Sequence, residues 1–523
     1  MQHDAVRTVL ILAALAAPAR AQTLKPEEVV VIANKASPES MDVARHYLER
    51  RGIPDKHLFL VDFPKSPRTI SFRHFEERLA APLRAWLVEN GLKDAVLCLV
   101  TVYDVPYVVS GPEVTAEERK TLAERNKLPH PDMVLTTRAS LDSELAWLWR
   151  ADVKDLDPAD LKFRSAYCYQ NRNPYYGQPM AFRDFRRRLS PEAAASFGTM
   201  YMTARLEGPS PAIARGLVDK ALQAEREGPS GIGYFDSKGP TLGNRKAGYP
   251  EGEFWARRAW IETHNAGFQT AREQTSELFG PDACPDALVY WGWYKLRDYR
   301  PSFGPAFRPG AIAIHTASAE ATDIRTPTDA GGPWCAGFLT HGVTATAGPV
   351  GEPFLNAFPH AELFFPRLYE GWSLGDAYWH AHLQLSWMMV LIGDPLYTPF
   401  GGKNRRPTYV RTGIGLPGGK VRSGGSTPLA LLLKAQAPIF KNPAAYKVVD
   451  PGTNGKTLTL TGLDAVRAEL REEGTLLVLT GPMLEAADLG PFEPRKEHGP
   501  ELEIHVDLGP DGGLKIISQL LAW

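Results

Sequence analysis

Short, continuous apolar runs alternate with amphipathic stretches along most of this 523-residue chain. The runs are too short for helices and lack the polar alternation of a half-exposed strand, so they are typical of buried strands in a parallel sheet. The expected strands occupy residues 29–33, 58–61, 95–103, 200–204, 232–235, 287–291, 311–314 and 343–347. Helices are expected between them, at 39–51, 70–90, 211–227 and 252–264. This alternation predicts the α/β class, with a doubly wound, mostly parallel sheet.

The pattern changes after residue 400. Residues 401–427 are rich in Gly, Pro, Arg and Lys, which predicts a linker with exposed turns. Short strands are expected beyond it at 429–433, 457–461, 475–480, 502–506 and 514–517, with one helix at 463–472. We therefore expect an α/β domain over 22–400, in one piece or two sub-domains, and a small, mostly β accessory domain over 428–523.

The first residues have the features of an export signal. Arg7 precedes an apolar run at 9–17, and Ala19-Arg20-Ala21 forms an A-x-A cleavage site. We expect residues 1–21 to be removed, and the mature protein to be soluble and exported, either periplasmic or extracellular. No apolar run is long enough to predict a membrane span.

Charge and cysteine content exclude several classes of function. The 59 Lys and Arg residues nearly balance the 60 Asp and Glu residues, so the chain has no field to hold a polyanion, and we expect no nucleic-acid partner. The four cysteines, at 98, 168, 284 and 335, form no C-x-x-C, which excludes zinc-finger and dithiol redox motifs. Two disulfides in any of three pairings, or free buried thiols, both remain open.

Polar side chains follow most of the expected strands. In doubly wound sheets, ligands bind beyond the carboxyl ends of the strands. The residues at or just after these ends are Asn34, Asp104, Arg205, Asp236, Trp293 and His315, with Glu352 a little further on. Each polar one alone is explained by a turn or a helix cap, but together they predict a ligand-binding rim.

Roles in this rim follow from side-chain chemistry. His315 is the candidate general base, oriented by Asp236 or Glu352. Arg205 is suited to bind an anionic group, with Asn34 and Asp104 beside it in the substrate site. Two alternatives stay open: His315 ties its loop to a backbone carbonyl, and Trp293 closes the core instead of walling a pocket. The spacing of Asp236, His315 and Glu352 matches no metal-ligand pattern, so we expect no metal and no cofactor.

One motif imitates a catalytic site. Gly371-Trp372-Ser373-Leu374-Gly375 matches the G-x-S-x-G nucleophile elbow, which needs a strand before it and a helix after it. Here a helix is expected before it, at 362–370, and Ser373 with Asp376 forms a capping box for a helix over 376–384. We therefore interpret Ser373 as a helix N-cap.

The quoted segments resemble a known family. The chain resembles an uncharacterised family of exported bacterial proteins in the segments VVVIANKASPES, TARLEG, GIGYFDSKG, VYWGWY, GAIAIHTASAEA and LIGDPLYTPF. The α/β domain of that family is similar to gingipain-type cysteine peptidases of the caspase clan. The resemblance implies a caspase/gingipain-like fold in which a catalytic His follows one strand and a Cys the next. The His position falls near Trp293, and the Cys position near His315 or Thr316, so neither catalytic residue is present. Cys284 and Cys335 lie elsewhere in the sequence.

Two functions therefore remain open. The first is a non-peptidase binding protein that kept the peptidase-like fold, with an unknown peptide, protein or small ligand as its partner. The second is a hydrolase of altered mechanism that uses His315. An exported assembly component is a third, if the region after Gly413 carries a large exposed apolar patch.

Overall fold

The computed structural model describes residues 24–64, 67–111, 115–125, 138–149, 172–178, 180–189, 198–236, 250–266, 268–273, 277–304, 306–401, 447–449, 459–461, 465–471, 474–482, 501–508 and 514–522. The expected signal peptide (1–21), residues 402–427 of the expected linker, the strand at 429–433 and Cys168 lie outside these residues. The signal peptide, the linker and the domain boundaries thus stay predictions.

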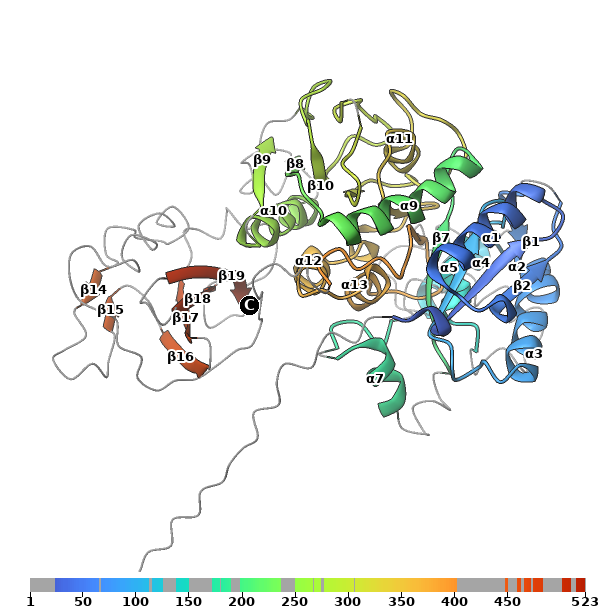
Figure 1. Ribbon diagram of the computed structural model, residues 1–523, viewed down its shortest axis with the longest axis horizontal. Helices are drawn as coiled ribbons and strands as arrows, with labels where there is room; N and C mark the ends of the chain where they lie inside the picture. Colours follow the sequence, from blue (N-terminus) through green and yellow to red (C-terminus); the bar gives the residue numbers. More distant parts are fainter. Residues whose placement is uncertain are drawn as a thin grey trace, which may run out of the picture.

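A ten-stranded sheet forms the centre of the molecule (Figure 1). From one edge to the other its strands are β2 (Leu58–Val61), β1 (Val29–Asn34), β4 (Cys98–Val102), β7 (Met202–Leu206), β13 (Met389–Ile392), β12 (Ala345–Pro349), β11 (Ile312–His315), β10 (Ala287–Gly292), β8 (Ile232–Asp236) and β9 (Gln269–Glu273). Only β12 and β13 pair antiparallel; the other neighbouring strands of this sheet are parallel. The predicted mostly parallel α/β sheet is confirmed.

The sheet has two halves that meet at β13. The first half is β2-β1-β4-β7, and the second is β12-β11-β10-β8-β9. β13 pairs with β7 through Ile392 and Arg205 and with β12 over four residue pairs. Asp394, just after β13, accepts hydrogen bonds from Tyr47 Oη at 2.8 Å and Arg51 Nε at 2.5 Å, both on α1 (Pro38–Arg51). The strand that joins the halves is thereby fixed to the first helix of the chain.

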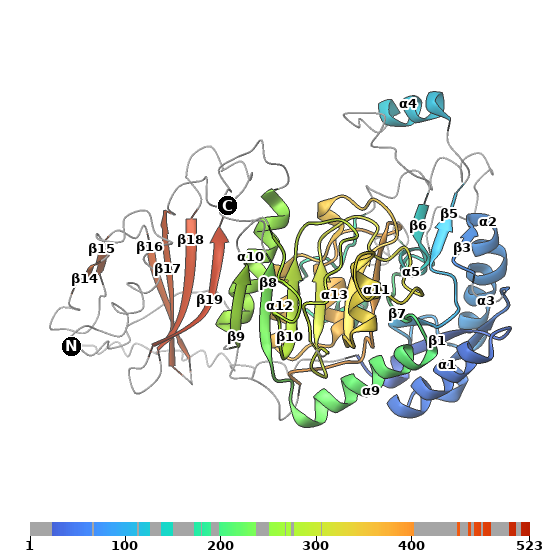
Figure 2. The ribbon, with the colours of Figure 1, turned by 90° about the horizontal axis from the view of Figure 1, so that it is seen from above.

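Helices cover both faces of the sheet, as a doubly wound fold requires. In the first half, Val29 and Val31 share a core with α1 and α9 (Pro211–Glu227), which lie side by side in Figures 1 and 2. Val30 and Ile32 face the opposite core, with α3 (Ala81–Glu89) and α5 (Leu141–Ala146).

In the second half, successive residues of β10 likewise contact helices on opposite faces. Tyr290 packs on Trp334 and Phe338 of α11 (Trp334–Thr340), while Trp291 packs on Phe365 of α12 (Ala361–Tyr369). The remaining helices described are α2 (Phe72–Phe75), α4 (Ala116–Arg125), α7 (Phe182–Arg188), α10 (Pro250–Asn265) and α13 (Leu374–Ala381).

The structure differs from the sequence analysis in the first half. The helix expected at 70–90 is broken into α2, a π-helical segment (Glu76–Ala80) and α3. Its first residues instead belong to β3 (Thr69–Ser71), which forms a small sheet with β5 (Val108–Ser110) and β6 (Arg138–Ser140). Strands of three residues are too short to show a period, and β3 forms by parallel pairing with β5, in which Ile70 lies opposite Val109.

The C-terminal residues that the structure describes form a four-stranded antiparallel sheet. Its order is β16 (Ala465–Arg471), β17 (Gly474–Pro482), β18 (Glu501–Leu508) and β19 (Leu514–Ala522), and β14 (Lys447–Val449) pairs separately with β15 (Thr459–Thr461). The mostly β prediction is confirmed, but the helix expected at 463–472 is wrong. The good helix formers there pair antiparallel with β17, so strand pairing overrides their intrinsic propensity.

Candidate functional site

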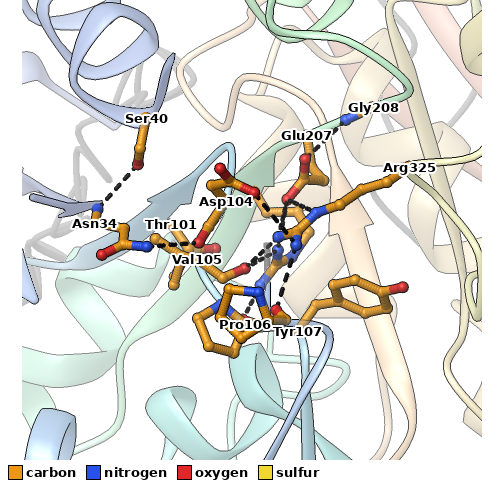
Figure 3. A network of polar contacts seen from close by, with 12 residues as sticks. Asn34, Ser40, Thr101, Asp104, Val105, Pro106, Tyr107, Glu207, Gly208 and Arg325 are labelled. Atoms are coloured by element: carbon orange, nitrogen blue, oxygen red, sulfur yellow. Dashed lines mark hydrogen bonds and ion pairs between the residues drawn. The ribbon is translucent and has the colours of Figure 1, made fainter. Parts of the chain in front are cut away.

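The strand-end residues fall into two separate clusters. The first lies at the ends of β1, β4 and β7 and contains Asn34, Asp104, Arg205, Glu207 and Arg325. All of these except Arg205 are labelled in Figure 3. The charged side chains of this cluster pair with one another. Glu207 Oε2 lies 2.9 Å from Arg325 Nη2 and 3.4 Å from Arg205 Nη1. Asp104 Oδ1 lies 3.5 Å from Arg325 Nη1. This cluster is an ion-pair network within the protein.

Arg205 is fully buried at the end of β7, with none of its side chain exposed. Its Nε and Nη2 donate to Asp142 Oδ2 at 3.0 and 2.8 Å. Its remaining donors reach the backbone oxygens of Val105 and Pro106. All three nitrogens of this guanidinium are thus bonded within the protein, whereas its place at a strand end predicts that it binds an anionic group of a ligand.

Asn34 and Asp104 are held in the same way. The side-chain amide of Asn34 donates to the carbonyl oxygens of Phe63 and Asp104, both at 3.2 Å. Asp104 Oδ2 accepts from Ser37 Oγ at 2.7 Å, and Asp104 has a left-handed backbone, with φ of 65°. Both residues shape the turns after their strands, as the alternative reading of strand-end polar residues predicts.

Arg325 comes from the loop that follows β11, here called the strap (residues 316–333). It donates to the backbone oxygens of Val105 and Pro67 as well as to Glu207. Its guanidinium also lies 5.3 Å from the ring of Tyr107. Burial lowers the pKa of the Arg325 guanidinium, but the carboxylates of Glu207 and Asp104 raise it by more. The pKa is therefore raised overall, and the group stays charged. The strap of the second half therefore covers the strand ends of the first.

The second cluster contains His315, at the end of β11. Its ring is 1% exposed and stacks on Trp334 with a centroid separation of 3.6 Å. Nε2 contacts the carbonyl oxygen of Tyr294, and Nδ1 lies 3.1 Å from Tyr290 Oη. Burial lowers the pKa of His315 to about 3, although the hydrogen bond to the backbone of Tyr294 raises it. This geometry matches the open alternative in which His315 ties a loop to a backbone carbonyl.

The two carboxylates proposed to orient His315 lie in different places. Asp236 reaches it indirectly, because Tyr290 Oη lies 3.3 Å from Asp236 Oδ2. Glu352 is exposed, and its oxygens accept from Ser318 Oγ at 2.6 Å and Phe354 N at 3.1 Å. Trp293 is 2% exposed, which matches the alternative that it closes the core.

Ser373 and the three cysteines that the structure describes are also buried. Ser373 is the N-cap of α13, and its side chain accepts from Asp376 N at 3.3 Å, as the sequence predicts. Cys98, Cys284 and Cys335 are buried free thiols, and burial raises the pKa of each. Within the described ranges, no group of three or more His, Cys, Asp or Glu side chains is arranged to hold a metal ion. The same part of the chain contains no helix long and apolar enough to cross a membrane.

Sequence reasoning missed Asp142, Glu207, Tyr290, Glu320 and Arg325. Glu320 Oε1 and Oε2 accept from the backbone N–H groups of Arg297 and Trp334 at 2.8 and 2.7 Å. Burial raises the pKa of Glu320 to about 7, although these hydrogen bonds lower it. The position of Glu207 could have been found from the sequence, because it lies two residues after Arg205 at the end of a predicted strand. The other four lie inside strands, helices or loops, where no spacing marks them.

Comparisons with known proteins give a distant likeness in overall chain course. A solved structure described as a protease is 10% identical, with a TM-score of 0.33, over 95% of this chain and 97% of that one. The complex of the pro- and mature domains of Porphyromonas gingivalis RgpB is 9% identical, with a TM-score of 0.35, over 88% and 98% of the two chains. No protein-family model matches the sequence, and no curated protein matches it. Neither structural likeness is close enough to assign a residue or an activity.

Proposed function

We propose that this chain is an exported binding protein that has a peptidase-like fold and does not cleave peptides. The observation that carries this proposal is the environment of His315. A general base needs a ring nitrogen within reach of a substrate proton. Both ring nitrogens of His315 face protein atoms, and its ring is covered by Trp334.

The described thiols support the same proposal. A cysteine peptidase attacks with a thiolate, which requires a lowered pKa and an accessible sulfur. Cys284 and Cys335 have the opposite environment, since each is 1% exposed and burial raises its pKa. The resemblance gives the catalytic His a position near Trp293 and the catalytic Cys a position near His315 or Thr316, where this chain has neither residue.

A surface for the partner is offered by the loop 293–299, which follows β10. Leu296 in this loop is 46% exposed, between Lys295 and Arg297. The loop is held firmly, because Arg297 N donates to Glu320 and Lys295 O accepts from Trp334 Nε1 at 3.0 Å. An apolar side chain presented on a fixed loop is suited to be an anchor for a peptide or protein.

Selection of displayed peptides against the purified protein tests this surface. We expect enriched peptides that bind the wild type and lose at least tenfold in affinity for Leu296→Asp. Leu60→Asp and Val88→Asp are matched controls, because both side chains are large, apolar and exposed, at 43% and 57%, on other elements. Equal losses in all three variants would contradict a site on this loop.

Incubation with a peptide library, followed by mass spectrometry, tests the absence of cleavage. We expect the wild type to produce no cleavage products beyond those seen with His315→Ala. Products that disappear in His315→Ala would favour the second candidate, a hydrolase that uses His315. One contact supports that candidate: Tyr290 links His315 to Asp236, as an orienting carboxylate would require.

A further inference from the structure

Glu320 joins three segments in the second half of the sheet. It lies on the strap, and none of its surface is exposed. Its Oε1 accepts the backbone N–H of Arg297, in the loop 293–299, at 2.8 Å. Its Oε2 accepts the backbone N–H of Trp334, the first residue of α11, at 2.7 Å. One carboxylate therefore holds both the start of a helix and the loop that carries Leu296.

This geometry suits the ionised carboxylate of Glu320. An ionised carboxylate only accepts hydrogen bonds, so each oxygen can take one of the two N–H groups. A protonated carboxyl carries a hydrogen on one oxygen, which makes that oxygen a donor and a poorer acceptor. Protonation of Glu320 therefore weakens one of its two hydrogen bonds, either to Arg297 N or to Trp334 N.

The loop is the weaker of these two attachments. Lys295 and Arg297 have φ values of 59° and 51°, in the left-handed region that residues other than glycine rarely adopt. Such conformations persist only where their surroundings fix them. Trp334, by contrast, is also held by its ring, which stacks on His315 with a centroid separation of 3.6 Å. We therefore expect the loss on protonation to fall on the bond from Arg297 N.

Burial brings the titration of this carboxyl into the neutral range. It raises the pKa of Glu320 to about 7, although the backbone hydrogen bonds from Arg297 and Trp334 and the charge of Arg297 lower it. The guanidinium of Arg297 is itself bonded to Thr322 Oγ1 at 2.7 Å and to Asp323 Oδ2 at 2.9 Å. Arg297 therefore acts on Glu320 through its backbone N–H and its charge.

Titratable groups on the neighbouring elements keep their charge near pH 7. Cys335 of α11 stays protonated, because burial and the charge of Glu320 both raise the pKa of its thiol. His315 of β11 stays neutral, since burial lowers its pKa to about 3. Burial raises the pKa of Asp323 of the strap, but the hydrogen bond from Arg297 and nearby positive charges lower it by more, so Asp323 stays ionised.

The other charged groups of the loop are engaged away from Glu320. Lys295 Nζ lies 3.5 Å from Glu277 Oε2, and Asp298 Oδ2 lies 2.8 Å from Arg300 Nη2. A change in the loop near neutral pH is therefore expected to originate at the carboxyl of Glu320.

We propose that Glu320 is a pH-dependent clamp on the loop 293–299. Its ionised carboxylate fixes the loop, so that Leu296 is presented in one position, and its protonation releases the loop. The part of this inference that concerns a ligand rests on the proposed binding function. A partner anchored on Leu296 binds more tightly above neutral pH than below it, because a released loop must be ordered again on binding.

Amide hydrogen exchange of the full chain tests the clamp without a ligand. Protection of the Arg297 N–H is its exchange rate relative to an unstructured peptide at the same pH. We expect protection to be about tenfold greater at pH 8 than at pH 6, because the ionised fraction of a group with a pKa of about 7 changes by that factor. Equal protection at the two pH values would overturn the proposal.

Two variants show whether this response comes from Glu320. Glu320→Gln has one acceptor oxygen in place of two and should give low protection of Arg297 N–H at both pH values. Asp323→Asn is the matched control: it removes another strap carboxylate but leaves the bond from Arg297 N to Glu320, so it should keep the pH response. Loss of the response in Asp323→Asn would overturn the assignment to Glu320. If Glu320→Gln fails to fold, the wild type and Asp323→Asn decide.

Binding gives a second readout. Histidine-free peptides selected at pH 8 that depend on Leu296 should bind the wild type about tenfold less tightly at pH 6. Their affinity for Glu320→Gln should be low at both pH values. Equal wild-type affinities at pH 6 and 8 would overturn the clamp and leave the binding function standing. Failure to select any peptide that depends on Leu296 would contradict the binding function instead, and amide exchange then decides on the clamp alone.

Discussion

Arg325 Nη2 donates to Glu207 Oε2 at 2.9 Å, although 118 residues separate the two in sequence. The contact joins the strap after β11 to the end of β7, in the other half of the sheet. Glu207 is fully buried, and a buried carboxylate without a partner is costly. The pair therefore helps to hold the strap over the strand ends of the first half.

We expect Arg325→Met to lower the free energy of unfolding by about 3 kcal/mol, because it leaves Glu207 and Asp104 with too little positive charge. Arg68→Met is the matched control: Arg68 pairs with Asp323 on the same strap, but its side chain is 43% exposed, so its loss costs under about 1 kcal/mol. Urea unfolding of both variants is the measurement. Equal losses of unfolding free energy in the two variants would show that the buried pair contributes no more to stability than the exposed one.

Glu320→Gln is expected to change the pH dependence of stability. The pKa of Glu320 in the folded protein, about 7, lies above that of an unfolded glutamate, so folding takes up a proton between pH of about 4.3 and 7. Stability from this group therefore falls as pH rises through that window and is constant above it. The variant should gain on the wild type by up to about 4 kcal/mol across the window, measured by urea unfolding. A difference between variant and wild type that does not change across this window would contradict the prediction.

The three described thiols are expected to resist alkylation in the folded protein. Cys98, Cys284 and Cys335 are buried, and the raised pKa of each keeps it protonated. Iodoacetamide at pH 8, followed by peptide mass spectrometry, should leave these three sites unmodified until urea unfolds the chain. Rapid labelling of Cys284 or Cys335 before unfolding would argue for a reactive thiol and against the binding function.

Ser373→Ala is expected to lower the free energy of unfolding by about 1 kcal/mol, through loss of the N-cap of α13. Ser373→Thr keeps the hydroxyl and should restore most of this loss. Thermal unfolding compares the two. An unchanged melting temperature in Ser373→Ala would contradict the capping role.

The sequence was sufficient for the elements that bury continuous apolar runs. β1 and β10 lie where the runs predict them, because these strands are buried on both faces and their apolar runs are continuous. β13 was missed: it has four residues, and its place between β7 and β12 is set by pairing across the sheet. The helix expected at 463–472 failed for the same reason.

The candidate site was harder to predict than the fold. The position of His315 at a strand end followed from the pattern, but its partner Tyr290 lies inside a strand and looks like any core residue in the sequence. The rim was expected to have charges free for a ligand. Arg205 and Asp104 instead pair with Asp142 and Arg325, and those contacts depend on loops whose paths no periodicity records.

β13 is the last strand of the main sheet to be synthesised, yet it lies at the centre. Until residue 392 is made, β7 and β12 are both open edges, and the chain consists of two incomplete sheets. Open edges invite pairing with other chains. A chain whose synthesis stops short of β13 is therefore at risk of aggregation, and a truncation before residue 389 should be far less soluble than one after residue 400.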